Sequence, residues 1–127
     1  MKSYSENLPP DFRVSYSLFS AEEGGRKTPH FQHIRWDFSY EEESIAEGNK
    51  LFMIWPEFIT PLGEMLPEGE PMPQNGLADM FILNNALREF HSQHIKPGVR
   101  GYFREGSRKI GVCEIIEIIA LYQNPKS

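Results

Sequence analysis

The stretch that decides the fold is VRGYFREGSRKIGVCEIIEIIAL, residues 99–121. Residues 99–104 and 109–121 read as strands, the second because it is rich in Ile and Val despite Glu114 and Glu117. Between them stands Glu105-Gly106-Ser107-Arg108, where the glycine permits the backbone conformation of a tight turn. The stretch therefore predicts a β-hairpin with a long second strand.

Two segments nearer the N-terminus show the period-two alternation of strands with one buried face. In residues 12–18 the inward positions are Phe12, Val14, Tyr16 and Leu18. In residues 34–40 they are Ile34, Trp36, Phe38 and Tyr40. Gly24-Gly25 predicts a turn between the two segments. We place the bulky aromatic residues in the core of a small barrel, where they fill the interior: Trp36, Phe38, Trp55 and Phe103.

The middle of the chain is less regular. Residues 51–55, LFMIW, predict a short buried strand stopped by Pro56. From Pro56 to Pro73 there are five prolines and two glycines, so we expect a long excursion without regular structure. Met65 to Met72 either forms an exposed partner-binding loop or packs over the end of the barrel. Leu77 to His94 fits a helix about as well as a strand, and periodicity leaves the choice open.

The length and composition bound the remaining expectations. A chain of 127 residues suits one domain, which we place at residues 11–122, with a flexible tail at 1–10 and a C-terminal tail at 123–127. No stretch is apolar enough for a membrane span or a secretory signal, which favours a cytoplasmic protein. The single cysteine, Cys113, has apolar neighbours and is expected to be buried.

The net charge of -5 argues against a uniformly basic nucleic-acid binder and leaves room for a local basic patch. Acidic residues gather at 41–43. Cations gather around Arg26 and Lys27, and again in a second group: Arg100, Arg104, Arg108 and Lys109. The surface is therefore either polarised for binding or an ordinary solvated charged face.

Two blocks carry a specific resemblance. SAEEGGRKTPHFQHIRWDFSY, residues 20–40, resembles the stretch that opens the third domain of elongation factor Tu. PGVRGYFREGSRKIGVCEIIEII, residues 97–119, is similar to the closing hairpin of that domain. The resemblance implies an all-β fold, a closed antiparallel six-stranded barrel. In that family the barrel contacts the T-stem backbone of aminoacyl-tRNA, and the residues that correspond to its tRNA contacts are Arg26, Lys27, Glu105 and Gly106.

The chain departs from the family pattern at several points. Asp37 corresponds to a glutamine that approaches the tRNA, and a carboxylate repels phosphate. His91 corresponds to a lysine and is mostly neutral at pH 7 unless its environment raises its pKa. Residues 41–76 are longer and richer in proline than the family pattern. No Gly-x-x-x-x-Gly-Lys-Ser/Thr loop is present, so the chain does not bind or hydrolyse GTP in the family's manner.

Other candidate sites are weaker. His30 and His33, like His91 and His94, form a His-x-x-His pair that would face a metal together on a helix or in a loop. No Cys or carboxylate completes a ligand set, so we interpret them as loop histidines and expect no metal or cofactor. Ser107 has no assigned base, and we expect no catalytic residues.

The first hypothesis is a non-catalytic binding module that contacts a tRNA-like RNA or a protein. The turn chemistry adds to the implied contacts two more cations for that basic face: Arg104 and Arg108. The second hypothesis is an immunity or decoy protein that uses the barrel to engage a toxin or a translation component. The third, a small metal-dependent or hydrolytic enzyme, rests only on the histidine pairs.

Overall fold

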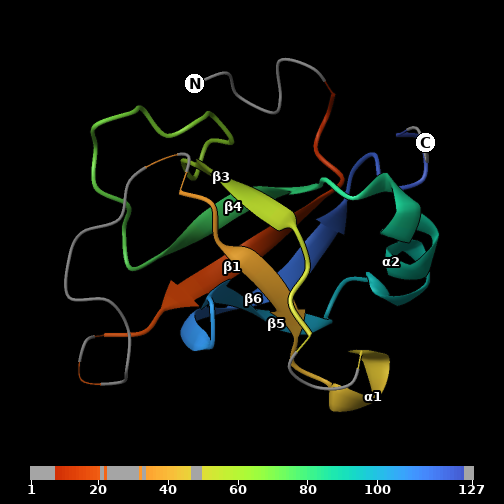
Figure 1. The fold of residues 1–127 in the computed structure, drawn as a ribbon. Coiled ribbons are helices and arrows are strands. Elements are labelled where there is room, and N and C mark those ends of the chain that lie inside the picture. The colour runs from red at the N-terminus through yellow and green to blue at the C-terminus, as the bar shows by residue number, and fades with distance from the viewer. Residues whose placement is uncertain (1–7, 21, 23–31, 33, 47–49, 125–127) are drawn as a thin grey trace.

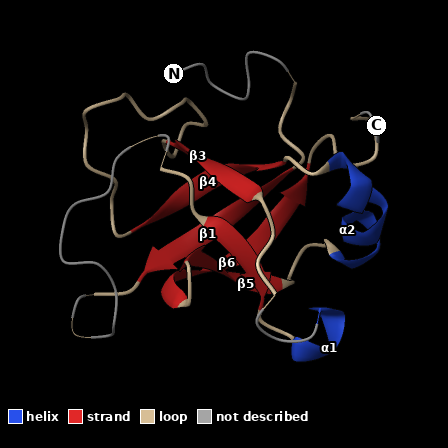
Figure 2. Cartoon of the chain, viewed as in Figure 1, coloured by secondary structure: helices blue, strands red, loops and turns tan. Residues whose placement is uncertain are grey.

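The structure is a computed structural model that describes residues 8–20, 22, 32, 34–46 and 50–124. The described residues form one antiparallel sheet with the strand order β2-β5-β6-β1-β4-β3. The strands are β1 (Phe12–Leu18), β2 (Asp37–Tyr40), β3 (Ile54–Ile59), β4 (Asn75–Ile82), β5 (Arg100–Glu105) and β6 (Arg108–Ile118). The sheet curls into an open half-barrel, and helices α1 (Glu43–Ala46) and α2 (Arg88–His94) lie beside it (Figures 1 and 2).

Several predicted elements are confirmed. β1 has the predicted bounds, and β5 and β6 form the predicted hairpin. The second strand begins at Asp37, three residues later than predicted, although Trp36 is buried as expected. Residues 77–94 contain both a strand and a helix. β4 ends at Ile82, and a 3-10 turn, η2 (Asn85–Leu87), then leads into α2.

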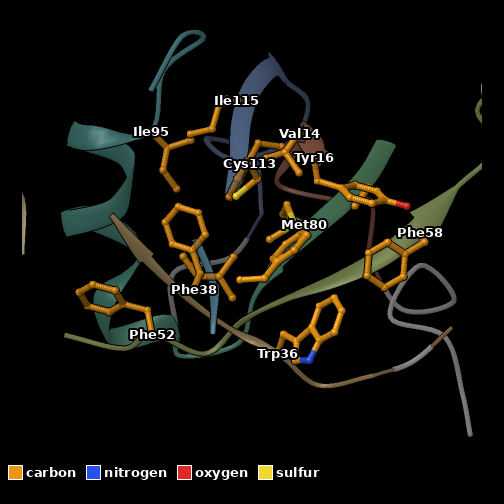
Figure 3. Packing of buried hydrophobic residues seen from close by; sticks show 14 of the residues in the cluster. Val14, Tyr16, Trp36, Phe38, Phe52, Phe58, Met80, Ile95, Cys113 and Ile115 are labelled. Atoms are coloured by element: carbon orange, nitrogen blue, oxygen red, sulfur yellow. The ribbon is translucent and has the colours of Figure 1, made fainter. Parts of the chain in front are cut away.

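The concave side of the sheet encloses the core. Figure 3 shows aromatic rings from several strands meeting there, with Trp36, Phe38 and Phe58 among them. The rings of Trp36 and Phe103 have centroids 5.5 Å apart, and those of Tyr16 and Phe58 meet edge to face at 5.4 Å. Cys113 is buried as predicted, and burial raises the pKa of its thiol, so the thiol is unreactive.

The predicted closed barrel is wrong, and the sheet is open between its two edge strands, β2 and β3. One bridge spans this seam: Phe38 N donates to Phe52 O at 2.9 Å, and Phe52 N donates to Phe38 O at 2.8 Å. A ladder does not continue beyond this pair along β3, contrary to what closure requires.

Pro56 explains the opening. We predicted that Pro56 ends a strand, and this is also wrong, since β3 runs through it. Leu66 N donates to Phe58 O from outside the sheet, so Phe58 directs its backbone groups away from β4. Alternate residues of a strand direct these groups to the same side, so Pro56 also faces the seam. Proline has no N–H, and a closing strand would lack a donor there.

The Gln32 side chain stands in for the missing strand. Phe38 and Gln32 lie opposite Phe52 and Phe58, respectively, so the register is the same at both positions. Gln32 Nε2 donates to Phe58 O at 2.8 Å and to Leu66 O at 2.9 Å, and its Oε1 accepts from Phe58 N at 2.7 Å. The Gln32 amide therefore hydrogen-bonds to the N–H and C=O of Phe58 that face the seam, as a neighbouring strand would.

The residues after β3 form the expected irregular excursion, now confined to residues 60–74. Leu66 and Met72 are buried against the core, whereas Leu62 is 85% exposed. Two side chains of the segment from Met65 to Met72 thus pack on the core, as expected if this loop covers the end of the sheet.

A buried polar cluster joins both ends of the described chain. The Asp11 carboxylate accepts from Arg88 Nη1 at 2.6 Å, from Ile82 N at 2.7 Å and from Asn124 Nδ2 at 2.8 Å. Asn124 Nδ2 also donates to Pro9 O at 3.0 Å. Hydrogen-bonded structure thus extends past the predicted domain limits of 11 and 122 at both ends.

Among the described residues, no helix has the length and apolar character needed to cross a bilayer.

Replacing Gln32 with alanine tests the seam. We expect Gln32→Ala to lower the free energy of unfolding by about 2 kcal/mol, because the buried N–H of Phe58 loses its partner, whereas the C=O of Phe58 keeps its bond from Leu66 N. Urea denaturation measures the change. Gln93→Ala, the same substitution at an exposed position of α2, is the control and should change little. Equal effects of the two substitutions would contradict a sealing role for Gln32.

Candidate functional site

The β5–β6 hairpin positions four of the six predicted partner-binding residues. Glu105 and Arg108 form the last pair of the ladder, and Gly106 and Ser107 are the two residues of the turn. Gly106 has a φ of 59°, in the left-handed region that glycine adopts without strain. The predicted turn is confirmed, and Arg26 and Lys27 lie outside the described residues.

The Arg104 side chain is buried and is not part of the exposed surface of the hairpin. It is 5% exposed, and it donates from Nη1 to Ser39 Oγ at 3.1 Å and from Nη2 to Ser107 O at 3.2 Å. Its Nε has no partner within the described part of the chain. The prediction of an exposed Arg104 is therefore wrong, because its side chain runs along β2 and back to the turn. The guanidinium fixes the turn to the neighbouring strand.

Glu105 also has a structural contact. Its Oε2 accepts from the indole Nε1 of Trp36 at 3.0 Å, although the residue remains exposed. The bond links the start of the hairpin turn to a core aromatic residue. Of the predicted residues on the hairpin, Arg108 is the exposed cation.

We use the name hairpin face for Arg108, Lys109 and Tyr102 at the end of the hairpin. Lys109 lies with the half-buried Tyr102 on the outer side of the sheet, whereas Arg108 precedes it in β6 and pairs with Glu105 on the other side. Lys109 is exposed, and its Nζ lies 4.3 Å from the centroid of the Tyr102 ring. A cation over a ring face is attracted by the ring quadrupole, so Tyr102 holds the ammonium in place. Lys109 belongs to the cations predicted from the sequence, whereas Tyr102 was not predicted; the alternation of β5 places it on the outer side of the sheet.

A shallow groove lies beside this face on the outer side of β5, β6 and β1. Its volume is about 200 Å³, and its lining includes Ser15, Ser17, Arg100, Val112 and Glu114. Two rows of three paired residues cross β1, β6 and β5: Ser17–Val112–Tyr102 and Ser15–Glu114–Arg100. The small side chains of Ser15 and Ser17 on β1, next to the longer ones of β6 and β5, leave the depression.

The charges of the groove are only partly compensated. Arg100 faces Glu114 in the ladder, but its Nε forms an ion pair with Glu41 Oε2 at 3.6 Å instead. Within the described residues, the Glu114 carboxylate and the hydroxyls of Ser15 and Ser17 have no hydrogen-bond or ion-pair partner. The groove therefore offers one cation, one anion and two hydroxyls to a ligand. The sequence carried no signal of it, because the three strands that form it are far apart in the chain.

The other aromatic and acidic positions are structural. Asp37, which corresponds to a tRNA-approaching glutamine in the resemblance, accepts from Trp55 Nε1 at 3.1 Å. Trp55 is half-buried on the outer side of β3, with Arg35 5.0 Å from its ring centroid. The prediction that Trp55 lies in the core is therefore wrong. The contact instead braces the seam between β2 and β3.

His91 and His94 lie on α2, not in a loop as predicted. His91 is 1% exposed, its Nδ1 lies 2.7 Å from the hydroxyl oxygen of Tyr40, and its ring packs against Phe52. No group of three or more His, Cys, Asp or Glu residues suited to a metal occurs in the described segments, and His30 and His33 lie outside them. His91 is thus part of an aromatic cluster, with one nitrogen already engaged.

No known protein-family model matches the sequence of this chain.

The burial of His91 gives stability a defined pH dependence. Burial, with the nearby charges of His94 and Arg88, lowers the pKa of His91 to about 4. The unfolded chain, with a pKa near 6.5, then binds more protons between these values, so stability falls as the pH drops through this window. For a shift of this size the loss is on the order of 3 kcal/mol.

Denaturation at several pH values should show this loss, and His91→Gln should flatten it. His94→Gln is the control on the same helix and should keep the dependence, because burial, the largest cause of the shift, is unchanged. A wild-type stability that stays level from pH 6.5 to 4 would show that His91 is not protonated on unfolding.

Proposed function

We propose that the protein is a non-catalytic binding module of the cytoplasm that contacts the phosphate backbone of a structured, tRNA-like RNA through the hairpin face. The proposal rests on one observation: two exposed cations, Arg108 and Lys109, project from a hairpin whose turn is fixed by a buried arginine. The sequence resemblance to the third domain of elongation factor Tu supports the same class of partner.

The rigidity of the hairpin favours binding. The turn contains two residues, and its carbonyl at Ser107 is held by Arg104. Tyr102 restricts Lys109 through its ring. Side chains that are already positioned lose less conformational entropy when they bind a ligand. Lys109 is therefore suited to a fixed anionic group, such as a backbone phosphate, and Arg108 adds a second cation at the rigid end of the hairpin.

The acidic balance of the chain limits the binding to this face. With a net charge of -5, the protein repels nucleic acid over most of its surface. Arg100 is paired with Glu41 through its Nε at 3.6 Å, whereas no ion pair is formed by Arg108 or Lys109 within the described residues. We therefore expect modest affinity and a strong salt dependence. The resemblance implies Arg26 and Lys27 as further cations that contact the RNA.

Charge reversal at the hairpin face tests the proposal. We expect Arg108→Glu/Lys109→Glu to weaken the binding of deacylated tRNA at least tenfold and to reduce the slope of log affinity against log salt by about 2, one for each phosphate contact. Fluorescence anisotropy at several salt concentrations measures both quantities.

The matched control is Lys50→Glu/Lys96→Glu, which makes the same change in net charge at exposed positions away from the hairpin turn. It should weaken binding far less. Equal losses in the two double variants would mean that overall charge governs binding, and the hairpin face would have no special role. Reversal of Arg26 and Lys27 together should have an effect as large as that at the hairpin.

An immunity or decoy protein is the second candidate. The feature that it would use is Leu62, which is 85% exposed in the excursion after β3 and is free to enter an apolar pocket of a partner protein. Co-purification of a toxin or a translation component that is lost on Leu62→Ser, together with no binding of tRNA at low salt, would support this candidate over the first.

A further inference from the structure

We infer that the groove on β5, β6 and β1 binds a ribose of the RNA, with the Glu114 carboxylate accepting a hydrogen bond from the 2′-hydroxyl. This inference rests on the proposed function, since it names the part of the RNA that lies next to the phosphates held by the hairpin face. It assigns a ligand to a site that no prediction from the sequence had included.

The groove and the hairpin face form one surface. Val112 lies opposite Tyr102 in the ladder, and Tyr102 holds Lys109. Along β6, Lys109 and Val112 are three residues apart, or roughly 10 Å at the rise of an antiparallel strand. An RNA backbone that contacts Lys109 therefore reaches the groove along the outer side of the sheet.

The polar groups of the groove suit a ribose better than a second phosphate. Glu114 is exposed and unpaired within the described residues, and its charge repels phosphate. A carboxylate is a strong acceptor for a sugar hydroxyl, as in sites that hold a ribose 2′-hydroxyl with an acidic residue. Ser15 and Ser17 each add one donor and further acceptors. Arg100, at the other side, can contact the phosphate that follows the sugar.

The size of the groove agrees with this ligand. A shallow groove of about 200 Å³ has room for a sugar. Recognition of this kind distinguishes RNA from DNA without reading sequence, because the 2′-hydroxyl is the group that differs.

The probe is an RNA hairpin and the same hairpin with 2′-fluoro in place of every 2′-hydroxyl, which keeps an A-form shape and removes the donor. We expect wild type to bind the RNA about tenfold more tightly than the fluoro form, the value of one charge-assisted hydrogen bond. Glu114→Ala should abolish this preference by weakening RNA binding, while binding of the fluoro form stays the same or rises, because a charge that repels phosphate is gone. Anisotropy titrations measure all four affinities.

The control is Glu117→Ala, the same substitution on the same strand, at a residue that lies 3.9 Å from Arg13 and does not line the groove. It should keep the preference. Ser15→Ala/Ser17→Ala should reduce the preference without changing the fold.

The outcomes separate the inference from the proposed function. Equal binding of both hairpins by wild type, still weakened by Arg108→Glu/Lys109→Glu, would overturn the ribose site and leave the binding function standing. A preference that survives Glu114→Ala would also overturn it. If neither hairpin binds at low salt, the proposed function fails, and the inference fails with it.

Discussion

The Asp11 carboxylate is the interaction on which the rest of the structure depends. It bonds to Arg88 at the start of α2, to the backbone at the end of β4 and to Asn124 near the C-terminus. Arg88 is 3% exposed and also donates to Ile82 O and Asn85 Oδ1. Because Asp11 and Arg88 are both buried, loss of either charge would leave the other uncompensated, at a cost of roughly 3–5 kcal/mol. The cluster therefore sets where β1 begins and where α2 packs against the sheet.

The fold was predictable where the pattern of the sequence was local. The alternation in residues 12–18 and the glycine turn at 105–108 specify a strand and a hairpin through their own neighbours. The open seam was not predictable, because it depends on the direction in which Pro56 faces within β3. That direction follows from the register with β4, which the sequence does not display. The Asp11–Arg88 pair, separated by 77 residues, was missed for the same reason.

The candidate site likewise has a part that the local sequence predicts and a part that only the tertiary structure shows. Arg108 and the turn were found from the sequence, since both lie within one short segment. Arg104 has the same residue type as Arg108, and only tertiary structure shows that one guanidinium is buried and the other exposed. Tyr102 and the groove arise from pairings among β1, β5 and β6. The binding surface thus has a frame of buried polar contacts and a few exposed groups that the frame holds in position.

The seam has a consequence for how molecules of this protein behave at high concentration. An edge strand with free N–H and C=O groups recruits the edge of another molecule and starts aggregation. On β3, Pro56 removes one donor, and the Gln32 amide occupies both groups of Phe58. The sheet is left open without offering a continuous row of bonds, so the proline that opens the seam and the glutamine that covers it also protect the protein from self-association.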